Sequence, residues 1–322
     1  MPSEIDVVIH EVGPRDGLQA ASVIMPTEAK IEWIAALKAA GVPMIQAGSF
    51  VPPKLVPQLA DTNEVVRAAK AMGGFKVSAL VPNLKGAEAA LRAGVDQLNF
   101  VMSASEAHNQ SNVRKTHEQS LEEFTRIAQL KRSDPVLAGV VLNGGLATAF
   151  GCSIAGRVDQ DVVCRLVEAY ILAGAERLSL ADTVGYANPK QVGEVFRRVR
   201  GIAGNLEVGA HFHDTRGLGL ANAYAALEAE VREFDSCLGG LGGCPFAPDA
   251  SGNVVTEDLV FMLESAGLNT GIDLDRLLAA REIMETHLQG EPTHGAIAKA
   301  GLPKGFSAAR FLRQDGNIEH AD

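Results

Sequence analysis

The stretch AALKAAGV at residues 35–42 returns with small changes as AALRAGV at residues 89–95 and as AYILAGA at residues 169–175. In each copy an Ala- and Leu-rich segment runs into a glycine, and an apolar segment follows. Glycine often ends helices because it adopts the left-handed conformation without steric cost. This weak repeat predicts a chain that alternates helices with buried strands.

The same alternation extends along most of the chain. Apolar runs predict eight strands, at residues 5–12, 44–47, 76–81, 97–102, 137–142, 177–181, 206–213 and 234–237. Amphipathic segments predict the helices between them, at residues 27–40, 62–72, 84–93, 121–131, 160–173, 189–202 and 218–229. Several strands are nearly continuous apolar runs, as expected for parallel strands covered on both faces. The pattern predicts the α/β class and favours a (β/α)₈ TIM barrel, with a doubly wound open sheet as the alternative.

The alternation stops near residue 273. Residues 273–289 predict one more helix, for which Asp273 is the N-cap. Residues 290–322 are rich in Gly, Pro and charge, and they predict an appended segment that ends in a partly mobile tail. Because no linker divides the chain, we expect one catalytic domain over residues 1–289, made of the barrel and its C-terminal helix, followed by the tail.

The composition is that of a globular protein. Of the 322 residues 47% are hydrophobic and 21% charged, which excludes a disordered or collagen-like chain. The net charge of −10 argues against a nucleic-acid partner, although an anionic ligand can still bind in a locally basic pocket. Four cysteines without a C-x-x-C pair predict reduced thiols. With no export signal and no uncharged run of membrane-spanning length, we expect a cytoplasmic protein without a membrane partner.

An Arg–Asp pair follows the first predicted strand, in GPRDGLQ at residues 13–19. Barrels place their catalytic residues at the carboxyl ends of strands, so Arg15 and Asp16 are candidate catalytic side chains. Pro-Arg-Asp-Gly is also a good turn sequence, and the alternative is a turn whose Arg and Asp are solvated.

Two histidines end the seventh predicted strand, in AHFHD at residues 210–214. Alternate residues of a strand share a face, so His211 and His213 point to one side and Phe212 points to the helix layer. Buried imidazoles are costly unless they are protonated, hydrogen-bonded or metallated. Metal ligation is the more specific interpretation. The alternative is that hydrogen bonds within the core satisfy both imidazoles. Together with the carboxylate of Asp16, these ligands suit Mg²⁺ or Mn²⁺ acting as a Lewis acid.

A glycine-rich loop, GGLGGCP at residues 239–245, follows the eighth predicted strand. Such loops after the last strands of barrels often bind phosphate through backbone N–H groups. A loop that delivers the thiol of Cys244 to the site is as plausible, and a flexible loop with an incidental cysteine is the third interpretation. Asp182, which ends the sixth predicted strand, is either an acid that supports the site or a helix N-cap.

Three ordered motifs together resemble the hydroxymethylglutaryl-CoA lyase family of DRE-type metallolyase barrels. They are VGPRDGLQ from residue 12, HFHDT from residue 211, and GGLGGCPFA from residue 239, the last continued by ASGN and TEDLV. The resemblance runs from about residue 5 to the helix after residue 273. The sibling synthases and aldolases share the Arg–Asp and H-x-H parts but lack the G-G-C-P loop, which favours the lyase branch.

The resemblance implies a metal-dependent cleavage of a carbon–carbon bond in 3-hydroxy-3-methylglutaryl-CoA, or a close 3-hydroxyacyl-CoA, to acetyl-CoA and acetoacetate or another 3-oxo acid. It implies a divalent cation, Mg²⁺ or Mn²⁺, with its ligands at Asp16, His211, His213 and Asn253. An acyl-CoA is then the substrate, leucine degradation is the metabolic setting, and we expect a homo-oligomer, most simply a dimer.

The family's enolate-stabilising arginine falls on Arg15, and its catalytic cysteine falls on Cys244. We expect Asp16 and His211 to take part in catalysis as well as in metal binding. Arg15 is also expected to contact the substrate, together with two further side chains, Gln46 and Asp182.

The sequence departs from the family pattern at several positions. Gln46 stands where the family usually has Glu, Ser22 falls in the stretch that often carries Lys, and an Arg is missing near Asn143. The family's D-T-Y-G becomes D-T-R-G, with Arg216 in place of Tyr. An amide at position 46 carries no charge and is not a useful base, so Gln46 predicts a changed substrate preference or slower cleavage of hydroxymethylglutaryl-CoA. The alternative is that Asp182 or another acid covers the lost function.

Two rival functions follow from the same residues. One is a related enzyme that runs an aldol or Claisen-type reaction on another acyl-CoA or oxoacid. The other is a barrel that keeps its metal site but binds a ligand without turnover.

Overall fold

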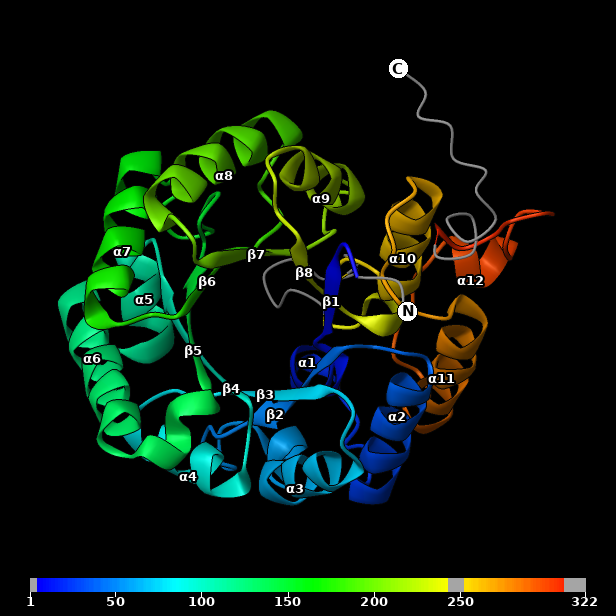
Figure 1. The fold of residues 1–322 in the computed structure, drawn as a ribbon, viewed down its shortest axis with the longest axis horizontal. Coiled ribbons are helices and arrows are strands. Elements are labelled where there is room, and N and C mark those ends of the chain that lie inside the picture. Colours follow the sequence, from blue (N-terminus) through cyan, green and yellow to red (C-terminus); the bar gives the residue numbers. More distant parts are fainter. Residues whose placement is uncertain (1–4, 243–251, 310–322) are drawn as a thin grey trace.

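A closed barrel of parallel strands forms the centre of the molecule (Figure 1). The computed structural model describes residues 5–242 and 252–309. The barrel strands follow one another in chain order, and β1 pairs with β8 to close the circle. Their bounds are β1 Val8–Glu11, β2 Met44–Ser49, β3 Lys76–Leu80, β4 Gln97–Ser103, β5 Val141–Ala147, β6 Arg177–Asp182, β7 Glu207–Phe212 and β8 Glu233–Ser236. The predicted TIM barrel is confirmed, and the open sheet is excluded.

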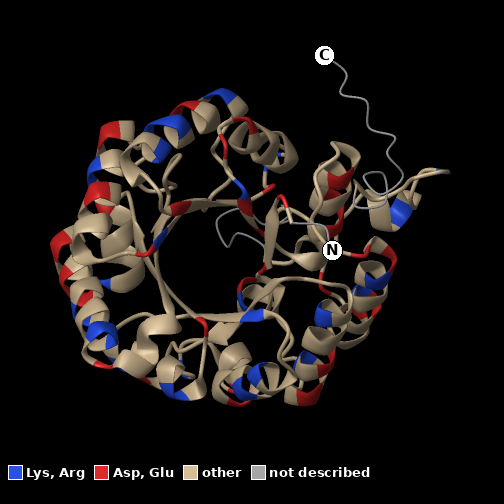
Figure 2. Cartoon of the chain, in the orientation of Figure 1, with Lys and Arg blue, Asp and Glu red and all other residues tan. Residues whose placement is uncertain are grey.

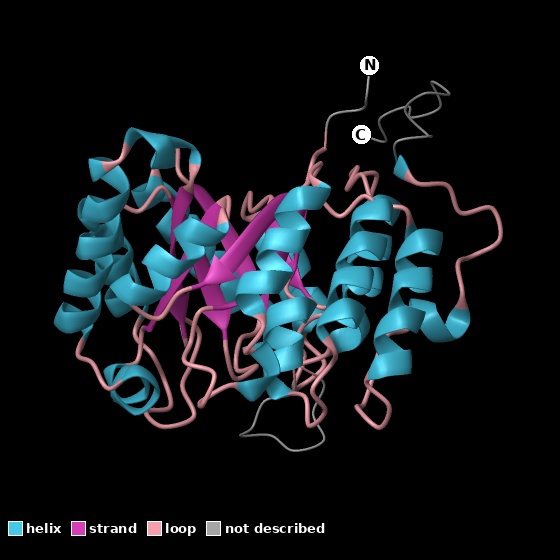
Figure 3. Cartoon of the chain, turned by 90° about the horizontal axis from the view of Figure 1, so that it is seen from below, coloured by secondary structure: helices cyan, strands magenta, loops and turns pink. Residues whose placement is uncertain are grey.

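Helices surround the strands on all sides, so that the sheet is buried behind them (Figure 3). Their bounds are α1 Leu18–Ala20, α2 Thr27–Ala39, α3 Thr62–Met72, α4 Leu84–Ala93, α5 Glu106–Val113, α6 His117–Ser133, α7 Gln160–Ala173, α8 Pro189–Ala203, α9 Gly219–Glu228, α10 Thr256–Ser265, α11 Leu274–His287 and α12 Ile297–Ala300. Short turns of other helix types are η1 Gly13–Gly17, η2 Pro57–Leu59, η3 Pro135–Gly139 and η4 Leu238–Gly240. Among the described residues no helix combines the length and apolar character needed to cross a bilayer.

The glycines of the sequence repeat end helices as predicted. Gly94 follows α4 with φ 89°, and Gly174 follows α7 with φ 103°, both in the left-handed region. An L-residue with a side chain is strained there, whereas glycine is not. The repeat therefore marks the point at which each helix turns back into the sheet.

The fifth strand lies later in the chain than predicted. Residues 135–139 form the turn η3, and β5 covers Val141–Ala147, which includes Gly144 and Gly145. A Cβ on Gly144 would lie 2.8 Å from the ring of Tyr170, so glycine is required because α7 packs this ring against the strand. In the sequence the two glycines resemble a turn. In the structure they lie within β5, where the absence of a side chain lets a neighbouring ring pack against the strand.

The apolar core lies between the strands and the surrounding helices. Phe212 of β7 points outward and packs against Phe150 and Phe196, with ring centroids 5.9 and 6.3 Å apart. This arrangement confirms that Phe212 faces the helix layer. The barrel interior is polar instead, because Arg177 pairs with Glu233 at 2.5 Å and donates to Gln97 at 3.1 Å.

The chain beyond the barrel folds back onto it. α11, predicted from residues 273–289, packs against α2 on the outside, and Asp273 caps it by accepting from the N–H of Arg276 (Figure 1). The N–H of His294 then donates to the carbonyl of Gly239 at 2.8 Å, next to the end of β8. Residues 290–309, which the sequence places in the tail, thus contact the catalytic end of the barrel, and residues 310–322 lie outside the described ranges.

Charged side chains are distributed around the helical shell. Basic and acidic positions are interspersed along the helices of the shell (Figure 2). A further set of charged groups lies at the ends of the strands, and these groups build the candidate site.

Candidate active site and metal centre

The carboxyl ends of β1, β7 and β8 bring the sequence motifs together. GPRDG forms the π-helical turn η1 directly after β1, and His211 lies in β7. His213 follows β7 and pairs with Asn253 in an isolated β-bridge, which joins the chain after the glycine-rich loop to the strand end. Residues far apart in sequence thus meet at one end of the barrel, as the motif positions predict.

Asp16 lies at the centre of this cluster. Its Oδ2 is 3.9 Å from Nε2 of His211 and 3.9 Å from Nε2 of His213. Asn253 Nδ2 donates to the same oxygen at 2.8 Å and to the carbonyl of Leu241 at 3.1 Å. The two imidazole centroids lie 5.2 Å apart, so both histidines face Asp16 as predicted.

This donor set fits a divalent cation. One ligand atom each from Asp16, His211 and His213 lies within 4.8 Å of the others. Asn253 Oδ1 is buried and has no hydrogen-bond partner among the described residues, so an oxygen donor remains for an ion. A carboxylate, an amide oxygen and two imidazoles suit Mg²⁺ or Mn²⁺.

The charges of the cluster are compatible with metal binding. Burial opposes the ionisation of Asp16, but the charges of Arg15, His211 and His213 and the hydrogen bond from Asn253 together outweigh it and lower the pKa of Asp16 to about 2. Burial and the neighbouring His211 lower the pKa of His213 to about 4, which keeps that imidazole neutral. Burial also disfavours a charged His211, yet the hydrogen bond from its ring to Asp235 raises the pKa above the ordinary value. Metal ligands must be deprotonated, and binding at His211 therefore competes with a proton.

Arg15 lies beside the cluster rather than in solvent. Its guanidinium donates to Asp16 Oδ1, and its side chain is 14% exposed. Its Nε is buried without a partner among the described residues, so the group retains a donor for a ligand. The alternative of a solvated turn is wrong, because η1 holds both side chains against the barrel.

Glu11 holds this turn in place and is a residue that our sequence reasoning missed. Its buried carboxylate accepts from the N–H groups of Gly13 and Leu238 and from the hydroxyl of Thr256. A Cβ on Gly13 would lie 2.5 Å from Glu11 Oε1, so glycine is required at this approach. Burial raises the pKa of Glu11 to about 7. The signal in the sequence is a charged residue inside the apolar run of the first strand.

Asp182 is fully buried at the end of β6. Its two oxygens accept from the N–H groups of Tyr186 and Ala187, so it closes the turn before α8. Burial raises the pKa of its carboxyl to about 6. Asp182 is therefore not a helix N-cap, because the N-cap of α8 is Asn188, whose side chain accepts from the N–H of Gln191. Its contact with a substrate stays a prediction.

Gln46 lies in β2 and is 6% exposed. It is two residues from Met44, whose sulfur accepts from Arg177 inside the barrel, so the two share the interior face. Gln46 therefore faces the interior as predicted, while its effect on substrate preference stays a prediction.

The other departures from the family pattern have local partners. Ser22 donates from its N–H at 2.6 Å and from its hydroxyl at 2.5 Å to Glu291. Asn143 donates to Asn99 and Ser179 inside the barrel. Arg216 donates to the carbonyls of residues 184 and 185 and lies 4.6 Å from the centroid of a tyrosine ring at position 186.

Cys244 lies outside the described residues. The cysteines within them, Cys152, Cys164 and Cys237, are buried and free. Burial raises the pKa of Cys237 well above its usual range, which makes this thiol a poor nucleophile or acid. These three cysteines match the structural role expected from their apolar surroundings.

Comparisons with known proteins identify the family of the chain. The model of the HMGL-like family matches residues 6–284. The hydroxymethylglutaryl-CoA lyase of Bacillus subtilis is 42% identical over 292 residues, which cover 91% of this chain and 96% of that protein. The (R)-citramalyl-CoA lyase of Chloroflexus aurantiacus is 40% identical over 318 residues, which cover 95% of this chain and 99% of that protein.

The fold agrees equally well with solved structures. An HMG-CoA lyase from Acinetobacter baumannii, in complex with coenzyme A and 3-methylmalate, is 44% identical and has a TM-score of 0.86. The match covers 94% of this chain and 97% of that one. Family model, relatives and structure thus span the barrel and the strand ends at which the cluster lies. The chain therefore belongs to the HMGL-like family and is an enzyme of the lyase class, similar to hydroxymethylglutaryl-CoA lyases.

Proposed function

We propose that the protein is a metal-dependent lyase that cleaves 3-hydroxy-3-methylglutaryl-CoA, or a close 3-hydroxyacyl-CoA, to acetyl-CoA and acetoacetate or another 3-oxo acid. The observation that carries the proposal is the convergence of Asp16, His211, His213 and Asn253 beside Arg15. A carboxylate, two imidazoles and an amide oxygen around one point suit a divalent ion, and the adjacent guanidinium suits a developing anion.

The reaction makes three chemical demands. The tertiary hydroxyl must lose its proton, the bond between carbons 2 and 3 must break, and carbon 2 must gain a proton. The electron pair of the broken bond becomes the enolate of the acetyl-CoA thioester. When bound, a divalent cation would polarise the hydroxyl and the carbonyl of the substrate.

The protein side chains supply the other functions. Asp16, His211, His213 and Asn253 would hold the cation, and the side chain of Asp16 stays ionised because its pKa is about 2. Arg15, with an unpaired buried Nε, would stabilise the enolate oxygen electrostatically. Cys244 would return a proton to carbon 2 as a general acid.

Mass spectrometry of the products tests this proposal directly. The protein is incubated with hydroxymethylglutaryl-CoA and Mg²⁺ or Mn²⁺, and a parallel sample contains a chelator. We expect acetyl-CoA and acetoacetate in equal amounts, formed only in the sample with metal. Binding of acyl-CoA without product across a panel of 3-hydroxyacyl-CoA substrates would instead identify a barrel that binds without turnover.

A second candidate substrate is (R)-citramalyl-CoA. The Chloroflexus aurantiacus lyase named for this activity matches nearly the full length of the chain. Citramalyl-CoA also carries a tertiary hydroxyl at carbon 3, so the same bond cleavage yields acetyl-CoA and pyruvate. Including it in the panel separates the two substrates through the oxoacid product.

Gln46 gives a prediction about substrate preference. Gln46→Glu restores a carboxylate on the interior face of β2, where it can accept a proton or pair with Arg15. We expect kcat/KM on hydroxymethylglutaryl-CoA to rise, by up to the ~10²–10⁴-fold of a general acid–base contribution. Steady-state rates on this substrate, on citramalyl-CoA and on longer analogues measure the change.

The matched control is Gln46→Met, which keeps the size of the side chain and adds no carboxylate. An efficient wild-type enzyme that gains nothing from Gln46→Glu would contradict the prediction. Such a result would mean that another acid, such as Asp182, covers the role.

Cys244 gives a second prediction. Cys244→Ser should lower kcat by ~10²–10⁴-fold, because a hydroxyl is a much weaker acid than a thiol. Thiol alkylation should inactivate the enzyme, and substrate should protect it. Cys164→Ser is the control, because this thiol lies on the outer helix α7 and not in the glycine-rich motif. A wild-type rate in Cys244→Ser would assign the general acid to another group.

The proposal extends to partners and location. We propose an acyl-CoA substrate and either Mg²⁺ or Mn²⁺ as the cofactor, with a homodimer in the cytoplasm as the working form. Leucine degradation is the setting that the hydroxymethylglutaryl-CoA substrate suggests. A net charge of −10 supports the absence of a nucleic-acid partner.

A further inference from the structure

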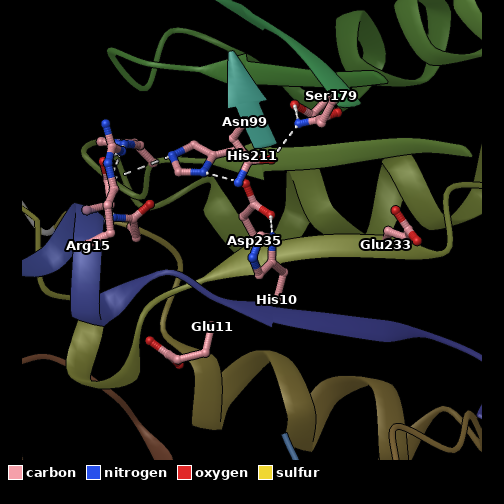
Figure 4. Close-up of polar contacts among 12 residues, drawn as sticks. His10, Glu11, Arg15, Asn99, Ser179, His211, Glu233 and Asp235 are labelled. Atoms are coloured by element: carbon pink, nitrogen blue, oxygen red, sulfur yellow. Dashed lines mark hydrogen bonds and ion pairs between the residues drawn. The ribbon is translucent and has the colours of Figure 1, made fainter. Parts of the chain in front are cut away.

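The carboxylate of Asp235 lies between two imidazoles inside the barrel (Figure 4). Asp235 Oδ2 is 3.1 Å from Nδ1 of His211, and Asp235 Oδ1 is 3.0 Å from Nδ1 of His10. Asp235 is in β8, His10 in β1 and His211 in β7, and β8 lies between the other two strands in the barrel. Closure of the barrel therefore creates this triad.

The contact fixes which nitrogen of His211 carries the proton. Each oxygen of the Asp235 carboxylate lies within hydrogen-bond distance of an imidazole Nδ1, at 3.0 Å from His10 and 3.1 Å from His211. An ionised carboxylate only accepts hydrogen bonds, so Nδ1 of His211 must donate. In a neutral ring the lone pair then lies on Nε2, the atom that faces Asp16 at 3.9 Å.

His10 holds Asp235 by the same logic. Its Nδ1 donates to the carboxylate, so its Nε2 accepts from the hydroxyl of Ser78 at 2.8 Å. The Ser78 oxygen in turn accepts from Asn99 Nδ2 at 3.1 Å. His10, Ser78 and Asn99 are at most 4% exposed, so this chain of hydrogen bonds has one consistent direction and little freedom to move.

His213 has no equivalent support. Its Nδ1 is buried without a partner among the described residues. The two histidines that share one motif are therefore held differently, and only His211 has an acidic partner for its second nitrogen.

We propose that Asp235 and His10 are positioning residues for the metal centre. Asp235 fixes His211 in the tautomer and ring orientation that present Nε2 to the ion, and His10 fixes Asp235. Neither residue contacts the substrate or the ion in this scheme. The inference rests on the proposed role of His211 as a metal ligand, and its tests are chosen so that the two can fail separately.

The first test determines the tautomer of His211 in the absence of metal and substrate. ¹⁵N-labelled histidine in the metal-free protein gives NMR signals that distinguish an Nδ1–H from an Nε2–H imidazole, and His211→Gln assigns the signal. We expect His211 to be the Nδ1–H tautomer in the wild type and to lose this preference in Asp235→Ala. An Nε2–H tautomer at His211 in the wild type would overturn the inference whatever the enzyme catalyses.

The second test measures affinity for Mn²⁺ alone by electron paramagnetic resonance. Loss of an outer partner of a metal ligand typically weakens binding ~10–100-fold, and we expect Asp235→Ala to fall in this range. Glu233→Ala is the matched control, since it removes a carboxylate from the same face of β8 that pairs with Arg177 instead of an imidazole. Equal affinity in both variants and the wild type would refute the positioning role. Absence of Mn²⁺ binding by the wild type would instead refute the proposed metal ligands and leave the tautomer result standing.

Two conservative variants of His10 separate positioning from general stability. His10→Asn keeps an amide near the position of Nδ1 and can still donate to Asp235. His10→Gln places its amide near the position of Nε2 and faces Ser78. We expect His10→Asn to keep the Mn²⁺ affinity within about 3-fold of the wild type. We expect His10→Gln to weaken Mn²⁺ binding nearly as much as Asp235→Ala does, within the same ~10–100-fold range. The reverse order, or equal loss in both, would remove His10 from the scheme.

Discussion

His213→Ala is expected to abolish turnover and to weaken the binding of the divalent cation. His213 Nε2 is one of the ligand atoms around Asp16, and burial keeps its imidazole neutral and able to donate a lone pair. Removing a direct ligand should cost more than the ~10–100-fold in affinity that loss of an outer partner costs. Calorimetric titration with Mn²⁺, together with product formation at saturating metal, measures both effects.

The control for this variant is His287→Ala, at the end of α11 and outside the cluster of Asp16, His211 and His213. It should bind Mn²⁺ and turn over substrate as the wild type does. Undiminished Mn²⁺ affinity in His213→Ala would contradict the assignment of this histidine as a ligand. Turnover retained at metal concentrations that leave the variant unloaded would contradict the proposed metal dependence of the reaction.

Local patterns made most of the fold predictable. Apolar runs indicated parallel strands, and the glycines after the repeat sequences ended helices in the left-handed conformation, as at Gly94 and Gly174. These features depend on a few neighbouring residues, so they can be read from a sequence. Eight such units point to a closed barrel, although the pairing of β1 with β8 joins residues more than two hundred positions apart.

The errors in the predicted elements come from contacts that a local pattern does not contain. β5 is shifted because Gly144 makes room for the ring of Tyr170, which lies on the next helix. The helices α5 and α10 were not predicted from the sequence. α10 is different, because it follows the glycine-rich motif and the apolar spacing of its residues is a local signal in the sequence.

The candidate site also combines residues that the sequence predicts with contacts that only the structure shows. Asp16, His211 and His213 were predicted from strand-end positions and shared faces, and Asn253 and Arg15 gained their roles from the family resemblance. Their contacts follow from the structure, which brings Asp16 and Asn253 within 2.8 Å across 237 residues.

The residues that support the site could not be predicted from the sequence, for a physical reason. Glu11, His10 and Asp235 make their key hydrogen bonds between β1, the end of β8 and β7, and these contacts exist only once the barrel closes. In the sequence they are charged or titratable residues within short predicted strands, which marks them as unusual without identifying a partner. An interior charge in a predicted strand is therefore a reason to search the neighbouring strands for its partner.

Arg15→Gln is expected to lower kcat by ~10²–10³-fold with little change in KM. The guanidinium lies against Asp16 at the strand ends and is largely shielded from water, where its charge acts strongly on an anion. The enolate charge develops only as the carbon–carbon bond breaks, so the interaction stabilises the transition state more than the bound substrate. Mn²⁺ affinity should be retained or increased, because the variant removes a positive charge next to the ligands. That combination separates Arg15→Gln from His213→Ala, in which catalysis and metal binding fall together.

Arg216→Gln is the matched control for the loss of a positive charge. Arg216 lies at the same end of the barrel, where its guanidinium donates to backbone carbonyls and not to Asp16. A drop in kcat confined to Arg15→Gln would show that the location of the charge matters, and not merely its presence at this end of the barrel. Conversely, an unchanged kcat with a raised KM in Arg15→Gln would mean that the guanidinium binds the substrate and the transition state equally well. Stabilisation of the enolate would then have to come from the metal centre, and Arg15 would serve chiefly to keep Asp16 ionised and in place.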